Sequence, residues 1–399
     1  MKHFLLILIS PLFFSTPLFA QWTKIDTISS QHIVALALDG DTILAVPRGN
    51  VLYKSIDQGA TWTTVKISDD TIKTITIKLI DNVIYIGTIY HGIFMSKDHG
   101  RNWVNTGTNL LAVSGIEKVG THLYASTLGQ GVVIFDSISL NWKPFNTELP
   151  DYSANVYTLT KTSKGLIIGA GRNGTNYKYD TTTNEWIEGY YYGFLKPNLQ
   201  IDQILCEHDT LFAVNGSKIF RSNDGGEHWL QDKQGTQDGY SRSIRMGITN
   251  YFIVTNTLQG GTFIQQRDKF AADSATWALY DEYLPDGYAY DILDLGNKLF
   301  LGKTDGLYVK NLFVGITEPL SQESVISISP NPLTEHLLTI SGTHLVVSLS
   351  IYNSIGQAMQ ETHPGKAEFI LETDLNKGVY FVKMLLSNGQ SVLRKIVVD

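Results

Sequence analysis

The side chains of this sequence that could do chemistry are carboxylates, arginines and tyrosines spread along the chain. Hydrolysis of a glycosidic bond needs two carboxylates about 5 to 10 Å apart, and a clamp for a sugar carboxylate needs clustered arginines. The candidate acids are Asp202, Asp238, Asp286, Asp291 and Asp305, and the candidate arginines are Arg48, Arg172 and Arg245. The sequence does not pair these groups, so catalysis stays one of several alternatives.

Other kinds of reactive centre find little support. The histidines are unclustered, no nucleophile elbow is present, and no glycine-rich phosphate loop precedes a helix. The single cysteine, Cys206, lies in an apolar run and can form neither an intrachain disulfide nor a thiolate metal site. We therefore expect no metal and no cofactor. The net charge of -7, from 38 acidic and 31 basic residues without a basic stripe, argues against nucleic acid as a partner.

The elements that must position these residues are marked by the tryptophans. Apolar hairpins, such as residues 43–46 with 51–53, recur between them, and each follows another short strand-like run. One four-stranded sheet per period of about 40 residues is typical of a β-propeller blade. Residues 21–315 divide into seven such periods, so we expect an all-β fold with a seven-bladed β-propeller. The tryptophans, spaced by 39 to 48 residues, are Trp22, Trp62, Trp103, Trp142, Trp186, Trp229 and Trp277.

The two ends of this region complement each other. The seventh hairpin has no tryptophan after it, while Trp22 precedes the first hairpin without a sheet of its own. Residues 22–25 are therefore predicted to form the outermost strand of the last blade. This N-terminal strand would close the ring and leave no unpaired seam between the first and last blades.

Three of the tryptophans end the string S-x-D-x-G-x-x-W. A carboxylate two residues before a glycine can accept hydrogen bonds from turn amides, while the glycine takes the positive φ that the turn requires. The tryptophan is then expected to pack between neighbouring blades. The strings consist of Ser55, Asp57, Gly59 and Trp62, of Ser96, Asp98, Gly100 and Trp103, and of Ser222, Asp224, Gly226 and Trp229.

This string resembles the Asp-box, or bacterial neuraminidase (BNR) repeat, of sialidases, of a xyloglucanase-type group of glycosidases and of many non-catalytic propellers. The resemblance covers about three quarters of the chain and implies a sialidase-like fold. In that family the boxes lie on turns opposite the active site, which implies that these aspartates are structural, neither catalytic nor metal-binding. Two departures argue against sialidase activity: the F/Y-R-I-P signature is absent, and sialidases generally have six blades.

Residues 1–20 have the pattern of a signal peptide, with a basic start, an apolar run over 4–14 and small residues before Ala20. The mature chain is expected to begin near Gln21. No cysteine stands at the cleavage site, so no lipid anchor is expected. No later window reaches the roughly 18 apolar residues of a membrane helix.

A second domain, residues 325–399, is predicted after a linker at 316–324. Its alternating runs and turn residues indicate a small antiparallel, immunoglobulin-like β-sandwich. The Pro330-Asn331-Pro332 opening, a Leu-x-x-Gly-x-Tyr-x-Val strand and basic residues before the last apolar strand resemble the type A C-terminal sorting domain of the type IX secretion system. The resemblance implies the secretion machinery as partner and export through the periplasm and outer membrane. An ordinary immunoglobulin-like accessory domain is the alternative.

A propeller binds ligands mostly at one end of its channel, where the loops between middle strands meet the loops between blades. In this chain these predicted loops are rich in tyrosine, which can stack on sugar rings or anchor a protein partner. The candidate ligand-binding residues are Arg48, Tyr90, His91, Arg172, Tyr191, Tyr192, Tyr240, Arg242, Tyr288, Tyr290 and Asp305.

The predicted function is non-catalytic binding of a glycan or a protein by a secreted or cell-surface propeller. One alternative is a glycoside hydrolase, sialidase-like or xyloglucanase-like, that acts on the same face. The other is a purely structural surface scaffold. Hydrolysis of a polysaccharide would identify the enzyme, and retention of a glycan without turnover would identify the binding module.

Overall fold

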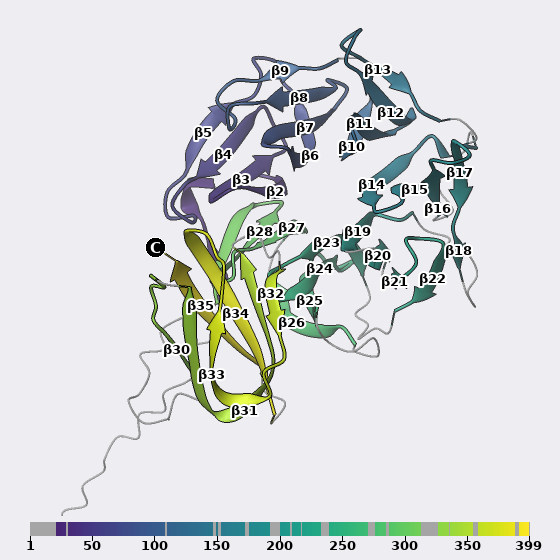
Figure 1. The fold of residues 1–399 in the computed structure, drawn as a ribbon. Coiled ribbons are helices and arrows are strands. Elements are labelled where there is room, and N and C mark those ends of the chain that lie inside the picture. The colour runs from purple at the N-terminus through teal and green to yellow at the C-terminus, as the bar shows by residue number, and fades with distance from the viewer. Residues whose placement is uncertain are drawn as a thin grey trace, which may run out of the picture.

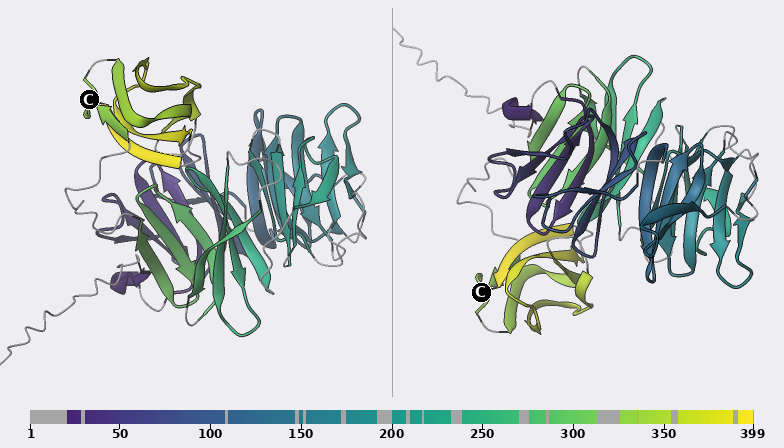
Figure 2. Two further views of the ribbon diagram at one scale, coloured as in Figure 1. Left: turned by 90° about the horizontal axis from the view of Figure 1, so that it is seen from below. Right: turned by 90° about the horizontal axis from the view of Figure 1, so that it is seen from above.

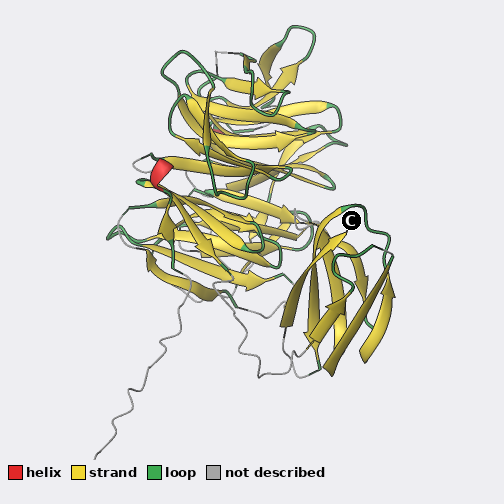
Figure 3. Cartoon of the chain, turned by 90° about the vertical axis from the view of Figure 1, so that its left-hand side faces the viewer, coloured by secondary structure: helices red, strands yellow, loops and turns green. Residues whose placement is uncertain are grey.

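The computed structural model describes most of the chain as β-strands. Among the described residues, the single helix is a short 3-10 turn, η1 (Asp26–Ile28) (Figure 3). The all-β prediction is therefore confirmed. The predicted signal peptide at 1–20 and linker at 316–324 lie outside the described residues. These are 21–28, 31–107, 110–146, 149–150, 153–171, 175–191, 200–207, 210–216, 218–232, 239–269, 276–284, 287–312, 326–334, 336–353, 358–387 and 391–398.

Seven sheets, as counted in the described residues, are arranged in a ring (Figure 1). Within each sheet, strands consecutive in sequence pair antiparallel, apart from strand β18 of the fifth sheet. The first four sheets are β2 (Ile33–Asp39), β3 (Thr42–Pro47), β4 (Val51–Ser55) and β5 (Thr63–Lys66); β6 (Lys73–Ile80), β7 (Val83–Ile89), β8 (Ile93–Ser96) and β9 (Val104–Asn105); β10 (Ala112–Val119), β11 (His122–Leu128), β12 (Gly131–Asp136) and β13 (Asn141–Pro144); and β14 (Val156–Thr162), β15 (Gly165–Ala170), β16 (Thr175–Asp180) and β17 (Glu185–Glu188).

The last three sheets complete the ring. The fifth carries an extra strand, β18, which pairs in parallel with β22 at its outer edge. These sheets are β18 (Tyr190–Tyr191), β19 (Gln203–Glu207), β20 (Thr210–Asn215), β21 (Lys218–Ser222) and β22 (His228–Gln231); β23 (Tyr240–Met246), β24 (Asn250–Asn256), β25 (Thr262–Asp268) and β26 (Ala278–Leu284); and β27 (Ala289–Asp294), β28 (Lys298–Lys303) and β29 (Gly306–Asn311) with β1 (Thr23–Lys24).

The first long strand of each sheet lies at the centre of the ring. We call these the inner strands: β2, β6, β10, β14, β19, β23 and β27. Each inner strand contacts the inner strands of both neighbouring sheets, and β27 contacts β2. The inner strands therefore close a circle around one channel.

Apolar clusters between neighbouring sheets form the core of the ring. Leu44 of the first sheet packs with Ile84 of the second, for example, and Phe300 of the seventh packs with Ile43 of the first. One tryptophan packs into each junction, which confirms the predicted place of the three string tryptophans, Trp62, Trp103 and Trp229, between sheets. From the junction of the seventh and first sheets onward the junction tryptophans are Trp62, Trp103, Trp142, Trp186, Trp229, Trp277 and Trp22.

The chain start closes the seventh sheet, as predicted. Strand β1 pairs antiparallel with β29, the last strand of that sheet. The Ile25 amide donates to the Leu307 carbonyl over 2.8 Å, and the Trp22 indole donates to Asp281 over 2.7 Å. Residues far apart in the sequence therefore complete one sheet, and its outer edge is covered.

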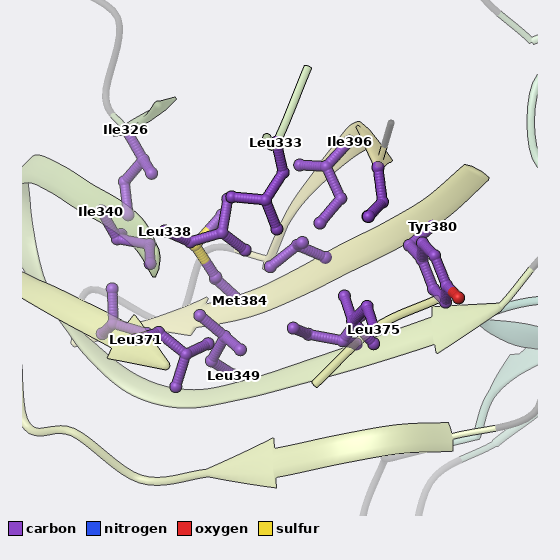
Figure 4. Packing of buried hydrophobic residues seen from close by; sticks show 14 of the residues in the cluster. Ile326, Leu333, Leu338, Ile340, Leu349, Leu371, Leu375, Tyr380, Met384 and Ile396 are labelled. Carbon is purple, nitrogen blue, oxygen red and sulfur yellow. The ribbon is translucent and has the colours of Figure 1, made fainter. Parts of the chain in front are cut away.

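The C-terminal residues form a separate six-stranded sheet with its own apolar core. Its long strand β31 pairs antiparallel with four others, β30, β32, β33 and β34, and β34 pairs with β35. The core includes Leu338, Leu349 and Met384 (Figure 4). The strands are β30 (Ile326–Ser329), β31 (Leu337–Asn353), β32 (Ala358–Thr362), β33 (Lys366–Glu372), β34 (Gly378–Leu386) and β35 (Ser391–Val398).

Removal of residues 21–28 is expected to destabilise the ring strongly. The truncation deletes β1 and the fully buried Ile28. It also exposes the edge of β29. A loss of at least about 3 kcal/mol should lower the melting temperature by about 5 °C or more for a ring of this size. Scanning calorimetry of the two forms tests this, and equal melting temperatures would contradict closure by β1.

Candidate functional site at the mouth of the central channel

The ring has two faces because consecutive strands in each sheet are antiparallel. The loops between second and third strands lie on one face with the connections between sheets. For example, the Gly129 amide in such a loop donates to the Ala154 carbonyl of a connection over 2.9 Å. We call this the mouth face. The opposite turn face carries the other turns of each sheet, including the three S-x-D-x-G-x-x-W strings.

A β-bulge recurs near the start of the inner strands. In six of them the pairing with the second strand skips one residue at the mouth face. In β19, Asp202 takes the same position, because its amide donates to the Val214 carbonyl over 2.9 Å just before Gln203 pairs with Val214. The seven residues, which we call the channel ring, are Val34, Ile75, Ser114, Tyr157, Asp202, Arg242 and Tyr290.

The bulges explain how the channel ring is built. An extra residue in one strand bends the strand locally and re-aims a side chain. All seven residues line one cavity of about 500 Å³ that the seven sheets share. Repeating one local distortion in each sheet therefore brings seven residues, distant in sequence, to the same opening.

The channel ring is chemically divided. Val34, Ile75 and Ser114, from three consecutive sheets, give a small and mostly apolar wall. The four residues from the remaining sheets place a carboxylate and a guanidinium between two tyrosines, Tyr157 and Tyr290. This half offers charged hydrogen-bonding groups flanked by flat aromatic surfaces.

Asp202 and Arg242 form the polar centre of the channel ring. Asp202 accepts a hydrogen bond of 2.6 Å from the Gln200 amide and a long one of 3.4 Å from Arg242 Nη1. Burial raises the pKa of Asp202 above its usual value. The Arg242 side chain is 48% exposed, and the contact with Asp202 is weak at this length. The guanidinium can therefore direct further donors at a ligand.

Tyr290 connects the channel ring to two other polar residues of the mouth face. Its ring lies 4.5 Å from that of His32, centroid to centroid, and the Arg48 amide donates to the His32 carbonyl over 2.8 Å. Burial, and then the positive charge of Arg48, lower the pKa of His32. His32 is therefore neutral near pH 7, and its buried Nε2 has no hydrogen-bond partner among the described residues.

The structure brings together only some of the residues that the sequence picked as ligand-binding candidates. Arg242 and Tyr290 belong to the channel ring, and the Arg48 amide is bonded to His32, whose ring lies beside that of Tyr290. Tyr90, Tyr240 and Tyr288 are exposed on the mouth face, by 69%, 45% and 41%, with His91 beside Tyr90, where its Nδ1 lies 3.0 Å from the Ile89 carbonyl oxygen. None of these four lines the channel cavity.

Other candidates lie away from the channel. Asp305 accepts hydrogen bonds from Lys24 and Tyr308, next to the closing strand β1. Tyr191 is on β18, the strand of the fifth sheet furthest from the inner strand β19. Arg172 and Tyr192, with the candidate acids Asp238 and Asp286, lie outside the described residues.

Asp291 and Arg245 form a structural ion pair in which the carboxylate is buried, while Arg245 is 37% exposed and lines the channel cavity. Arg245 donates two hydrogen bonds to the Asp291 carboxylate, from Nε over 2.5 Å and from Nη2 over 2.7 Å. Asp291 also accepts from the Leu36 amide and from the hydroxyl of Ser243, and it is only 1% exposed. Its oxygens are thus occupied by groups from the two neighbouring sheets, the sixth and the first. Asp291, on the seventh sheet, therefore links three sheets and has no oxygen left to act as an acid toward a ligand.

A second acid facing Asp202 is missing at the level of the channel ring in the described residues. The cavity is also lined by Glu117, three residues beyond Ser114 along β10 and so roughly 10 Å deeper. Glu117 is buried and paired with Lys78.

The three S-x-D-x-G-x-x-W strings share one hydrogen-bonded turn. In each, the serine hydroxyl donates to the aspartate over 2.8 Å, and the tryptophan indole donates to the glycine carbonyl. The glycines have φ of 84°, 82° and 91°. At the first string, hydrogen bonds from Thr61 and Ser55 lower the pKa of Asp57 to about 2. Each aspartate is thus engaged within its own turn.

One group on the turn face has the residue types of a metal site. The ligand atoms of Asp224, Glu227 and His228 lie within 4.8 Å of one another. However, His228 Nδ1 already lies 2.7 Å from Asp224, and Glu227 pairs with Lys178 over 2.8 Å. These contacts account for the cluster without an ion.

The channel-ring residues that the sequence did not single out are Tyr157, Val34, Ile75 and Ser114. A single strand with one extra residue has no compositional mark, so a bulge is invisible in one repeat. Aligning the seven repeats at the start of their inner strands would have placed these residues in one column.

Comparison with known proteins identifies the C-terminal sheet. Residues 327–399 match the family of the secretion system C-terminal sorting domain. We call this region the sorting domain from here on. This tail indicates handling by the type IX secretion system and export to the cell surface or the medium. No curated protein matches the chain in sequence. The described residues contain no helix that is long and apolar enough to cross a membrane.

Solved structures identify the fold of the ring as that of a β-propeller. PorZ, a surface component of the type IX secretion system of Porphyromonas gingivalis, has a TM-score of 0.56 at 14% identity, over 92% of this chain and 59% of PorZ. Virginiamycin B lyase of Staphylococcus aureus has a TM-score of 0.60 at 13% identity, over 73% of this chain and 99% of the lyase. YCF48 of Cyanidioschyzon merolae has a TM-score of 0.53 at 12% identity, over 73% of this chain and 98% of YCF48. The chain thus spans about three fifths of PorZ, and at these identities the likeness shows the fold alone.

Replacing Asp57 by Asn should destabilise the fold in a pH-dependent way. The folded-state pKa of about 2 lies below the ordinary 3.8, so ionised Asp57 stabilises the fold above pH 4, and this contribution is lost as the pH falls toward 2. The difference in melting temperature between wild type and Asp57→Asn should therefore shrink from pH 5 to pH 2, as measured by circular dichroism. The exposed Asp70→Asn serves as control, and a constant difference would contradict the assignment.

Proposed function

We propose that this protein is a secreted or surface-displayed seven-bladed β-propeller that binds a glycan at the channel ring without catalysis. The proposed domains are a signal peptide at 1–20, the propeller at 21–315, a linker at 316–324 and an immunoglobulin-like sorting domain at 325–399. In this proposal the three S-x-D-x-G-x-x-W strings are Asp boxes that hold the turn face. No cofactor takes part.

One observation carries the proposal: the repeated bulge directs an aromatic and charged half-ring into the mouth of a cavity. Tyrosine rings present flat apolar faces that suit the C–H faces of a sugar. Carboxylate, guanidinium and amide groups between them, from Asp202, Arg242 and Gln200, suit neighbouring hydroxyls. The recessed position favours a small repeating unit over a broad protein surface.

The exposed tyrosines of the mouth face extend this proposed site. Tyr240 and Tyr288 lie in the sequence just before the ring residues Arg242 and Tyr290, and Tyr90 stands on the second sheet. A longer saccharide seated in the channel ring would pass over this rim. The rim therefore supplies additional aromatic contacts for the units outside the cavity.

Substitutions in the channel ring are expected to weaken glycan retention. Tyr157→Ala and Arg242→Gln should each weaken binding at least about tenfold, or about 1.4 kcal/mol, because they remove a stacking surface and a charged donor. Retention on a glycan array, followed by calorimetry with the best ligand, measures this. Ile138→Ala and Arg101→Gln, exposed on the turn face, are the matched controls. Retention of no glycan by wild type would overturn the proposal, and release of reducing ends would replace it with a hydrolase.

Residues 320–399 are expected to direct a foreign protein out of the cell. Fused to an unrelated periplasmic protein in a host with the type IX system, they should move it to the surface or the medium. A fusion that ends before β35 should fail, because β35 pairs with β34 along its whole length. Fractionation and immunoblotting report the outcome. Retention of the complete fusion in the periplasm would contradict the proposed role of these residues as an export signal.

A further inference from the structure

The sorting domain packs against the turn face of the propeller (Figures 1 and 2). The side chains of β34 alternate between two environments. Tyr380, Val382 and Met384 lie in the core of the sorting domain, whereas Phe381 and Val379 pack against propeller residue Ile248. One strand thus serves the domain's own core on one side and the propeller on the other.

Two neighbouring turns of the propeller form a cradle for Phe381. They are the turn between β23 and β24, with Ile248, and the turn between β27 and β28, with Gly296. Gly296 has a φ of +82°, and a Cβ there would lie 2.8 Å from the Phe381 ring and 2.7 Å from Ile248. The phenyl ring therefore rests on a position that only glycine can occupy.

The cradle is fixed by the propeller itself. Asp294 accepts hydrogen bonds from the amides of both turns, from Ile248 over 2.9 Å and from Gly296 over 2.7 Å. Burial raises the pKa of this carboxyl group. Because Asp294 ties the two turns to each other, their spacing does not depend on the sorting domain.

A salt bridge beside the cradle sets the register of the contact. Lys383 Nζ donates to both oxygens of Asp268, each over 2.8 Å. The Lys383 side chain is only 11% exposed, while Asp268 is 41% exposed. Burial lowers the pKa of Lys383. A docked geometry shifted in register would leave this largely buried ammonium without its carboxylate, so the pair favours one docked geometry over its neighbours.

The contact reaches a third sheet of the propeller. Leu38 and Gly40 of the first sheet and Leu295 of the seventh line a small cleft together with Val379 and Phe381. Lys395 of β35 borders the same cleft. The sorting domain therefore touches the sixth, seventh and first sheets, where the ring is closed.

Neither domain needs this contact to complete its core. The sorting domain has a cluster of fully buried residues of its own, including Leu338, Leu349 and Val382, and the propeller is cored by its inter-sheet clusters. An interface between two separately cored units that combines a fitted aromatic ring with a partly buried ion pair has the features of a recognition surface.

We propose that the cradle is a binding site for the sorting domain that holds it on the propeller as a non-covalent complex even without the covalent link between residues 312 and 326. The partner is thus a folded sorting domain that presents Phe381 and Lys383 on the outer side of β34. This proposal concerns the turn face and does not depend on glycan binding at the mouth face.

The test uses the full chain with a protease recognition site inserted between residues 312 and 326. After complete cleavage at 5 µM protein, we expect the two fragments to co-elute in size-exclusion chromatography, which requires a Kd below about 1 µM. Elution of wild-type fragments as separate peaks, after cleavage confirmed by mass spectrometry, would overturn the proposal.

Charge reversal tests the geometry of the complex. Asp268→Lys and Lys383→Asp should each separate the cut fragments, and the double variant should restore co-elution. Lys366→Asp, exposed on β33, is the matched control and should leave the complex intact. Circular dichroism of the uncut variants distinguishes dissociation from misfolding. Single variants that still co-elute, or a folded double variant that does not, would contradict the assigned interface.

Discussion

Closure of the ring is the constraint on which the rest of this structure depends. A four-stranded sheet of this size cannot bury both faces by itself, and each sheet is cored only by its two neighbours. A missing junction would expose two apolar surfaces and a strand edge. The chain meets this need with β1, which completes the sheet begun by β27 almost 270 residues later. It also places one tryptophan in every junction, so the seven contacts are alike in kind although the sequences of the sheets differ.

Closure also explains why a site forms at the channel. Once seven inner strands are held in a circle, a local feature repeated in each strand points to a common axis. The bulge is such a feature, and it is compatible with residues as different as Val34, Tyr157 and Arg242. The scaffold thus fixes the positions of the channel ring and leaves their chemistry free, so specificity can change without any cost to the core.

The same physics decides what could be predicted from the sequence. Tryptophan spacing and paired apolar runs indicate which residues are buried, and burial repeats with the sheets. These patterns therefore predict the all-β ring, the closing strand and the packing of the indoles. The radial position of a loop residue has no such signature. Tyr191 and Asp305 therefore have suitable chemistry, but Tyr191 lies on the outermost strand of its sheet and Asp305 is bonded to Lys24 of the closing strand β1. Tyr157 was missed because a bulge adds a residue without changing the composition of its strand.

The two ends of the channel are built from the same strands. Strand β23 begins with Tyr240 and the ring residue Arg242 and ends just before the cradle turn with Ile248. Strand β27 likewise carries Tyr290 near its start and leads into the turn with Gly296. Between these ends, Asp291 ties β27 to Arg245 and Ser243 of β23 and to Leu36 of β2. The channel ring and the cradle therefore lie on opposite faces of the propeller but are joined by the same inner strands, which Asp291 holds together. Docking of the sorting domain on the turn face leaves the mouth face open.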